Sequence, residues 1–333
     1  MTTAISQKIR SANVLMTLFI IALHTFAWDE RMWPLRPLVN MAVPVFFVIS
    51  SYLYFQKWSF TLSCYKKKLK SRFWSLYVPF IVYNLLYVPY IWLKVTVFHA
   101  TDTRELIVGS IDMVTSVLFG YPNFPNPVLW YVWAVFVFAF FAPLMGWFVK
   151  RAKWSFPLLL VAVLPLSFLF PYTSVFYWLP CLLLGCFIAV YEGDMIAFVR
   201  KLSGYRWLVS FFLCYLFLFT YILKDEDVFS SLVYYIFRMS APYFAICIYA
   251  ICDNLLPQSF VKMVHPYTFP IYCLHVVFVN LSMQFILHYF AFLHFLLIQF
   301  SAFILAFSLV FLFCVMLSRI RPVWKILTGF RYS

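Results

Sequence analysis

The sequence has 333 residues, of which 65% are hydrophobic, 23% are aromatic and only 11% are charged. A soluble domain of this length needs much more polar surface, so the composition excludes a soluble globular protein and indicates an integral membrane protein. The net charge of +14 is compatible with a nucleic-acid binder, but in so apolar a chain basic residues more often mark cytoplasmic loops. We therefore expect membrane lipid around the chain and no nucleic-acid partner.

Segments long enough to span a bilayer follow one another along the whole chain. A spanning helix needs roughly 20 mainly apolar residues. The first such run follows Lys8 and Arg10, as a signal peptide would, but it lacks a small-residue cleavage site, so we expect a retained helix. The sequence predicts an all-α, polytopic helix bundle, a single domain over 1–333 without a separate soluble domain. About ten candidate spans lie near 12–28, 38–55, 74–97, 128–149, 156–171, 174–191, 206–223, 229–252, 268–288 and 293–317.

The basic residues predict how these spans are oriented. If the first residue is cytoplasmic, 19 of the 25 Lys and Arg residues fall in cytoplasmic segments. Such an excess marks the cytoplasmic side. We expect both termini in the cytoplasm and a multi-pass protein of the cell inner (plasma) membrane. The outer segments hold Arg31, Arg36, Lys94, Arg104 and Lys224, and Arg238 falls within a span.

The longest predicted outer loop covers about residues 98–127 and ends in the proline-rich stretch PNFPNP, Pro122–Pro127. Proline cannot donate to a helical hydrogen-bond ladder, so this stretch suits a turn-rich approach to the next span. The loop is either a lid over an outward-facing site or a plain connector.

The 8 cysteines do not suggest a disulfide framework or a metal centre. Most of them lie within apolar runs, where a thiol usually acts as a small core side chain. No pair has metal-ligand spacing with a histidine, so we expect no metal site.

Ionisable residues inside predicted spans are costly and are therefore functional candidates. His24 lies near the outer end of the first span, just before Asp29 and Glu30. A carboxylate there could fix the imidazole tautomer, so that the other ring nitrogen accepts a proton as a general base. The alternative is an interfacial histidine that faces lipid headgroups, with both carboxylates solvated.

Two further ionisable residues fall within spans. His275, in FPIYCLH, could act as a hydrogen bonder between helices. Arg238 lies too far inside its span to reach the surface easily, so it needs a carboxylate, backbone carbonyls or an anionic ligand.

The densest charge lies in the loop 57–72, where YKKKLKSRFW mixes cations with aromatic residues. A basic cytoplasmic loop of this kind either sets the topology and touches anionic lipid, or binds the phosphates of a cytosolic donor. Spacing alone does not separate the two readings. The cations concerned are Lys66, Lys67, Lys68, Lys70 and Arg72.

Five segments, taken together and in order, resemble the acyltransferase-3 family of integral membrane acyltransferases over nearly the whole chain. The first is IIALH, ending at His24, and the second is VPVFFVISSYL, which contains Phe46, Phe47 and Ser50. The others are KKKLKSRFWSLYVPF, PVLWYVW with Trp130, and FPIYCLH with Tyr272 and His275.

The resemblance implies acyl transfer, commonly of acetyl from cytosolic acetyl-CoA to a hydroxyl of an envelope or exported glycan. It implies that His24 is the catalytic base. A site for anionic CoA needs fixed cations, which the basic loop could supply, and Arg238 could supply another. The expected partners are acyl-CoA, a glycan or lipid-linked glycan acceptor such as a polysaccharide, and membrane lipid, with no tightly bound cofactor.

The chain departs from the family pattern at three positions. Asn13 stands eleven residues before His24, where the family has arginine, although Arg10 lies about one helical turn earlier. Trp133 stands where many members have a second arginine, and Ser51 replaces a glycine. Asn13 or Arg238 could polarise the donor carbonyl. The missing arginines leave two alternatives: a transporter or sensor that has lost the chemistry, or a structural subunit of a polysaccharide export system.

Overall fold

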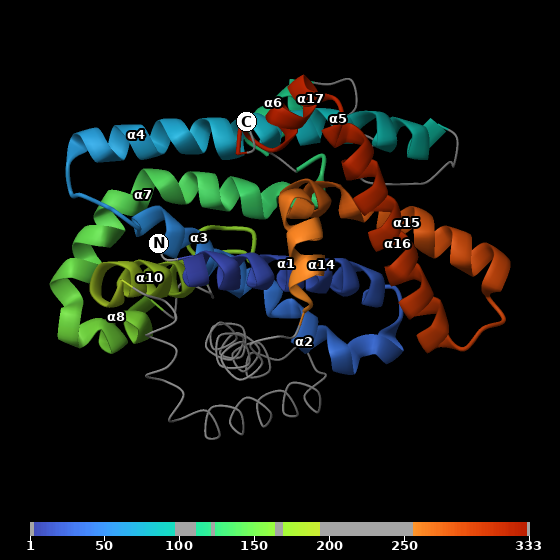
Figure 1. Cartoon of the computed structure of the whole chain (residues 1–333), viewed down its shortest axis with the longest axis horizontal. Helices are drawn as coiled ribbons and strands as arrows, with labels where there is room; N and C mark the ends of the chain where they lie inside the picture. The colour runs from blue at the N-terminus through green and yellow to red at the C-terminus, as the bar shows by residue number, and fades with distance from the viewer. Residues whose placement is uncertain (1–2, 97–110, 121–123, 164–168, 194–255, 332–333) are drawn as a thin grey trace.

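The structure, a computed structural model, describes residues 3–96, 111–120, 124–163, 169–193 and 256–331. These residues form helices and short helical turns without a strand, as the sequence predicts. The longer helices are α1 (Thr3–Phe26), α3 (Ala42–Phe55), α5 (Val78–Thr96), α7 (Trp130–Ala152), α15 (Thr268–Phe290) and α16 (Phe295–Ser318) (Figure 1). The shorter ones are α2 (Arg36–Asn40), α4 (Leu62–Arg72), α6 (Ile111–Phe119), α8 (Phe156–Val163), α10 (Leu179–Phe187), α14 (Gln258–Val264) and α17 (Arg321–Leu327). Short turns include η1 (Glu30–Leu35), η2 (Phe73–Tyr77), η4 (Pro127–Leu129), η6 (Ile188–Glu192) and η8 (His265–Tyr267).

Six helical stretches of the described chain are long and apolar enough to cross a membrane. Five of them overlap one predicted span each, and Pro127–Leu160 overlaps two. The predicted span 156–171 begins at α8, which a bend at Lys153 separates from α7, and its part 164–168 lies outside the described residues, so this span stays a prediction. The predicted spans 206–223 and 229–252 lie outside the described residues. Ten spans and cytoplasmic termini therefore remain predictions. The six stretches are Gln7–Phe26, Leu38–Phe55, Leu62–Trp92, Pro127–Leu160, Gln258–Phe290 and Phe295–Ser318.

The predicted span 174–191 is only partly helical. The chain turns through Pro171–Trp178, and the helix begins at Leu179, so that the apolar helix Leu179–Glu192 is shorter than a span. Non-helical backbone within a membrane protein is tolerated where it is buried in protein or lines a cavity. The turn Pro171–Trp178 meets this condition, because Trp178 is buried and Tyr172 lines a cavity described below.

The helices α3 and α10 pack with their backbones in close contact. A Cβ atom added to Gly185 would lie 2.3 Å from the carbonyl oxygen of Val48, so only glycine fits at this crossing. The Ser51 hydroxyl donates to the carbonyl oxygen of Leu182 at 2.6 Å. Ser51 therefore adds a hydrogen bond between the two helices.

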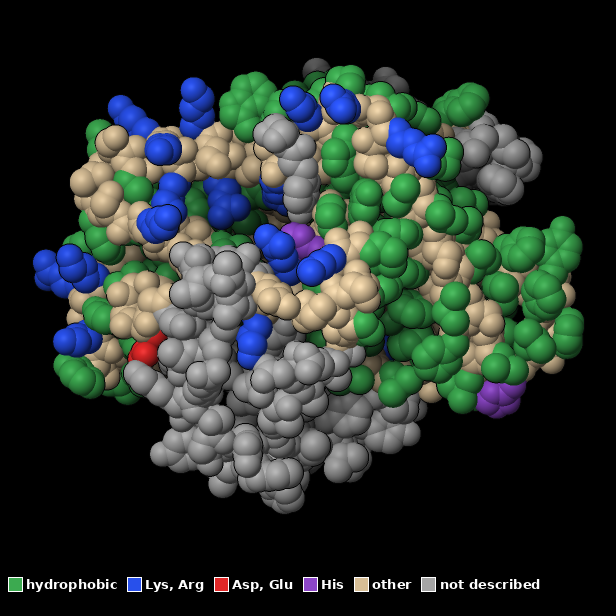
Figure 2. Space-filling view, viewed as in Figure 1, with side chains coloured by type: hydrophobic (Ala, Val, Ile, Leu, Met, Phe, Trp, Pro, Cys, Tyr) green, Lys and Arg blue, Asp and Glu red, His purple; other side chains and the backbone are tan. Residues whose placement is uncertain are grey.

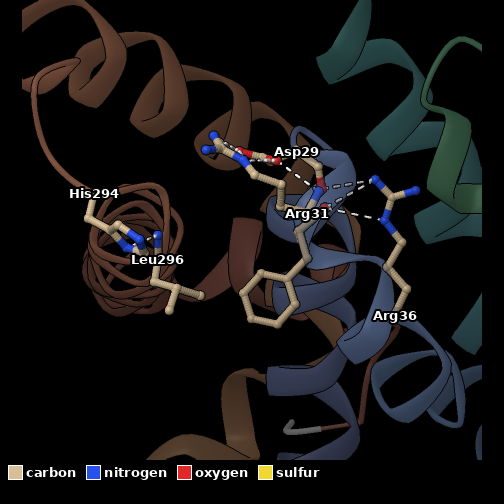
Figure 3. A network of polar contacts seen from close by, with 6 residues as sticks. Asp29, Arg31, Arg36, His294 and Leu296 are labelled. Atoms are coloured by element: carbon tan, nitrogen blue, oxygen red, sulfur yellow. Dashed lines mark hydrogen bonds and ion pairs between the residues drawn. The ribbon is translucent and has the colours of Figure 1, made fainter.

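An arginine ties down the end of α1. The Arg36 guanidinium donates to the carbonyl oxygens of Phe26, at 3.3 Å, and Ala27, at 3.1 Å (Figure 3). A weaker bond of 3.4 Å reaches the carbonyl of Asp29. The last carbonyls of a helix lack partners within the helix, and a cation there also suits the helix dipole. Arg36 thus fixes the last turn of α1, which carries His24.

The surface divides by charge. In Figure 2, many Lys and Arg side chains lie over α4 and the neighbouring end of α7, and others lie over α17 and in the centre of the view, whereas hydrophobic side chains cover most of the part over α15 and α16. The exposed side chains of α16 include Ile304, Leu312 and Met316, which suit contact with lipid.

Candidate functional site

A cavity of about 190 Å³ lies where α1, α2, α3, η4, α7, α15 and the turn before α10 meet. We call it the His24 cavity. It combines apolar and aromatic walls with a few polar groups, the composition usual for small-molecule sites. It is lined by Ile20, Leu23, His24, Asn40, Val43, Val128, Trp130, Tyr172, Trp178 and Tyr272.

The aromatic walls of the cavity are held by ring packing and hydrogen bonds. Trp130 and Trp178 stack at 6.2 Å between centroids, and Trp178 also stacks on Phe47 at 5.2 Å. The Trp178 indole N–H donates to the carbonyl oxygen of Tyr172 at 2.6 Å. The Tyr272 hydroxyl donates to the carbonyl oxygen of Val128 at 2.5 Å. The cavity is therefore bounded by fixed, flat rings.

His24 lies in the last turn of α1 and lines the cavity, and its ring packs against that of His275 at 4.9 Å between centroids. The sequence suggested that a nearby carboxylate orients His24, but in the structure Asp29 binds another residue. Both oxygens of Asp29 accept bonds from Arg31, at 2.7 to 3.2 Å, as Figure 3 shows. The Arg31 side-chain hydrogen bond also holds the pKa of Asp29 below its usual value. Asp29 is thus bound to Arg31, and the side chain that packs on His24 is that of His275 in α15.

His275 is fully buried in α15. Its Nδ1 lies 2.6 Å from the carbonyl oxygen of Tyr272 in the same helix. The hydrogen bond that the structure shows for His275 is therefore within α15, and the bond between helices that the sequence suggested stays a prediction. Its Nε2 is buried without a hydrogen-bond partner among the described residues.

The other family-motif residues meet beside the cavity around Tyr131. The Tyr131 hydroxyl lies 2.7 Å from the Ser50 hydroxyl and donates to the carbonyl oxygen of Phe46 at 3.1 Å. Its ring lies 5.6 Å from that of Tyr272 and 4.8 Å from that of Phe47. Motif segments far apart in the sequence thus form one continuous aromatic cluster.

Sequence reasoning missed two buried asparagines that join the loop before α7 to α5 and α15. The Asn126 amide donates to the carbonyl oxygen of Cys273 at 2.7 Å, and its backbone N–H donates to Asn84 Oδ1 at 3.2 Å. Asn84 and Asn126 are 0% and 1% exposed. An asparagine within the apolar run IVYNLLY was the available signal. The cavity residues Asn40, Tyr172 and Trp178 were also missed, since no motif marks them.

The predicted donor-binding cations divide into two sets. Lys66, Lys67 and Lys70 are exposed on α4. Lys68 points inward, where its ammonium donates to the carbonyl oxygens of Tyr54 and, at 3.0 Å, Gln56 at the end of α3. Arg72, one turn further along α4, lies over the Tyr54 ring at 5.5 Å.

A further arginine lies beside this inward pair. Arg331, after α17, donates to the carbonyl oxygen of Ser75 at 2.9 Å and lies over the Phe269 ring at 4.1 Å. Gly329 lets this segment approach, because a Cβ there would lie 2.6 Å from the Ser75 backbone. Sequence reasoning counted Arg331 only as a topology signal.

The remaining predicted site residues lie elsewhere or outside the described chain. Because α1 is continuous, Asn13 lies about 16 Å and Arg10 about 21 Å from His24 along its axis, at 1.5 Å per residue. Trp133, which stands in place of a family arginine, packs on Phe80 at 5.2 Å. Arg238 lies outside the described residues. Within the described part of the chain, no three His, Cys, Asp or Glu side chains gather as metal ligands.

The sequence was compared with known protein families, curated proteins and solved structures. The family model described as an acyltransferase domain matches residues 13–319, nearly the whole chain. No curated protein and no solved structure matches the chain. The match includes every residue of the His24 cavity together with His275. The chain therefore belongs to the acyltransferase-3 family and is a multi-pass membrane acyltransferase.

Proposed function

We propose that the protein transfers an acetyl or similar short acyl group from acyl-CoA to a hydroxyl of an envelope or exported glycan, with His24 as the general base. The observation that carries the proposal is the position of His24. It is an imidazole held at the end of a capped helix, facing a cavity with aromatic walls. An imidazole is the side chain best suited to accept and return a proton near neutral pH.

The reaction needs one proton transfer in each direction. His24 takes the proton of the acceptor hydroxyl while that oxygen bonds to the thioester carbonyl carbon. The tetrahedral intermediate then collapses, the carbon–sulfur bond breaks, and the CoA sulfur leaves with the proton from His24.

The cavity walls favour a sugar acceptor. Trp130, Trp178 and Tyr172 present flat apolar faces, on which the C–H face of a sugar ring packs. Asn40 and the Trp130 indole are polar groups of the wall that suit hydrogen bonds to sugar hydroxyls or to the carbonyl oxygen. Asn13 stands too far along α1 to donate to a carbonyl that His24 also reaches, so we assign it to the donor side.

The anionic part of acyl-CoA needs fixed cations. Lys68 and Arg72 face the body of the protein from one side of α4, and Arg10 lies near the start of α1. These residues suit the diphosphate and the 3′-phosphate, and Arg238 remains an expected contributor. Lys66, Lys67 and Lys70 point outward and suit anionic lipid or a first encounter with the donor.

One observation favours the alternative of a transporter or sensor without chemistry. Trp133 fills the place of a family arginine with an aromatic contact to Phe80, so that position supplies no cation. A transporter would move its solute across vesicle membranes without releasing CoA. A structural subunit of an export system would do neither, and would copurify with a partner.

The deciding experiment compares His24→Ala with His288→Ala, an exposed histidine on the same protein. Purified protein in lipid vesicles receives acetyl-CoA labelled in the acetyl group and a glycan fraction from the host envelope. We expect His24→Ala to lower acetyl transfer and CoA thiol release about 100- to 10,000-fold. His288→Ala should match the wild type. Unchanged transfer in a folded His24→Ala protein would contradict the proposal.

A further inference from the structure

His275 lies behind His24 with respect to the cavity. His24 lines the cavity, whereas His275 is 0% exposed and takes no part in the wall. The two ring centroids are 4.9 Å apart, and the ring planes are inclined by 55°. A side chain placed in this way touches the base and does not touch the substrate, which is the position of an orienting group.

The tautomer of His275 follows from its hydrogen bond to Tyr272. Nδ1 lies 2.6 Å from a carbonyl oxygen, and a carbonyl oxygen can only accept, so Nδ1 carries the hydrogen. In a neutral imidazole the other nitrogen then bears the lone pair. Nε2 of His275 is therefore a hydrogen-bond acceptor, and within the described chain it is buried and unpaired. A buried acceptor without a donor is unfavourable, which points to a donor that engages it when the protein works.

The backbone around His275 is held in place. The Tyr272 hydroxyl donates to Val128, and the Asn126 amide donates to the carbonyl oxygen of Cys273. His275 therefore has little freedom to move toward another partner. The ring of His24 is in contact with it, and a neutral imidazole has one N–H group to offer.

We propose that His275 is the positioning residue of His24: its Nε2 accepts the N–H of the His24 imidazole and directs the lone pair of the second His24 nitrogen into the cavity. The inference rests on the proposed role of His24 as the base. The acceptor proton moves to that lone pair, the acceptor oxygen bonds to the acyl carbon, and the CoA sulfur leaves with the proton. The bond to His275 persists throughout, so His275 stays neutral while His24 is charged and neutralised in turn.

Two substitutions separate the two nitrogens of His275. His275→Asn keeps a donor near the position of Nδ1 and removes the acceptor at Nε2. His275→Gln keeps an amide oxygen near the position of Nε2 and removes the Nδ1 donor. We expect His275→Asn to lower kcat about 10- to 100-fold, the usual loss when the orienting partner of a functional histidine is removed, with KM for acetyl-CoA unchanged. His275→Gln should retain most of kcat.

The opposite order, equal losses in the two variants or no loss in either would overturn the proposal. A purely structural role predicts that His275→Asn is the better tolerated variant, because it keeps the bond to Tyr272. Thermal unfolding of both proteins confirms that the comparison is made on folded enzyme. A wild-type protein that transfers no acyl group contradicts the proposed function instead.

A second measurement needs neither catalysis nor a substitution at His275. Diethyl pyrocarbonate modifies an imidazole nitrogen that bears an accessible lone pair, and mass spectrometry locates the modified peptide. In the wild type we expect modification of His24 and protection of His275, whose lone pair is covered. In His24→Ala the His275 peptide should become reactive. Protection of His275 in both proteins, or reaction in both, would overturn the assignment.

Discussion

The His24 cavity and the basic face of α4 differ in where their ionisable side chains lie. At the cavity, two histidines from α1 and α15 are brought ring to ring inside the protein. On α4, several cations stand close together in the sequence, yet only Lys68 and Arg72 face other protein groups. Lys66, Lys67 and Lys70 point outward.

The comparison teaches that density of charge along a sequence does not identify a site. Lys68 and Arg72 are four residues apart, so they share one face of α4, and that face meets the end of α3. The histidines are rare in the sequence and far apart, but they meet in space. Which face a side chain occupies decides whether it can act on a ligand.

The largest expected effect tests whether the two regions lie on opposite sides of the membrane. Lys67→Cys places a thiol on the exposed side of α4, and Phe292→Cys places one in the turn between α15 and α16, where Phe292 is 81% exposed. The distribution of basic residues predicts that α4 is cytoplasmic and that this turn is outside. In intact cells, an impermeant thiol reagent should label Phe292→Cys and leave Lys67→Cys unlabelled.

Both variants should label after the membrane is permeabilised, and the unsubstituted protein gives the background from the native cysteines. Labelling of Lys67→Cys in intact cells would reverse the predicted orientation. The donor would then have to come from the other side.

The next largest effect tests whether the inward cations of α4 contribute more to acetyl-CoA binding than the outward ones. If Arg72 contacts a phosphate of the donor, Arg72→Ala should weaken acetyl-CoA binding about 10- to 100-fold, the range for a hydrogen bond to a charged group. Lys67→Ala should weaken it less than about fivefold, because an exposed charge pair contributes little. Isothermal titration at low salt measures both affinities.

Arg72→Lys serves as the control for charge, since it keeps the cation and loses the planar fork of donors. Raising the salt to 1 M should reduce the affinity of the wild type, because the Debye length falls from about 10 Å at 0.1 M to about 3 Å. Equal losses in Arg72→Ala and Lys67→Ala would mean that the inward and outward cations act alike.

The smallest effect concerns two arginines near the end of α1. Arg36→Ala removes a cation that caps the last carbonyls of α1, and we expect the free energy of unfolding to fall by about 1–2 kcal/mol. Arg31→Ala should have a smaller effect, because Arg31 is exposed and pairs with a carboxylate at the surface. Denaturation in a mild detergent measures the difference between the variants.

The contribution of Arg31 should also depend on pH. The pKa of Asp29 is held below its unfolded value by the hydrogen bond from Arg31, so the stabilisation is present above the unfolded pKa, near 3.9. It is lost as the pH falls through the lower value of the folded state. The difference between Arg31→Ala and wild type should therefore shrink in acid to what the contact of Arg31 with the Phe295 ring contributes, whereas the deficit of Arg36→Ala, which involves backbone carbonyls, should persist.

The sequence predicts much of the fold, because a long apolar run has few alternatives in a membrane. The predicted span 38–55 coincides with the stretch Leu38–Phe55, and 293–317 nearly coincides with α16. The departure from a helix in the first part of 174–191 has a physical reason. Hydropathy reports that Tyr172–Trp178 is apolar and aromatic, but not that its backbone turns to line a cavity.

The sequence singled out the two histidines of the candidate site but not the contact between them. The cost of an imidazole within a span singled out His24, and the motif FPIYCLH singled out His275. Their contact depends on how α1 packs on α15, which no local pattern records. For the same reason Asp29, five residues further along the sequence, seemed the better partner for His24, while in space it binds Arg31.

The stacked pair Trp130 and Trp178 gives the wall of the cavity a spectroscopic signal. Two indole rings 6.2 Å apart and inclined by 24° couple their electronic transitions, so they contribute a near-ultraviolet circular dichroism signal that depends on fixed packing. Far-ultraviolet signal reports helices alone and persists when side-chain packing is lost. A detergent extract that keeps the far-ultraviolet spectrum but loses the near-ultraviolet one would therefore contain intact helices around a collapsed cavity, and its inactivity would say nothing about His24.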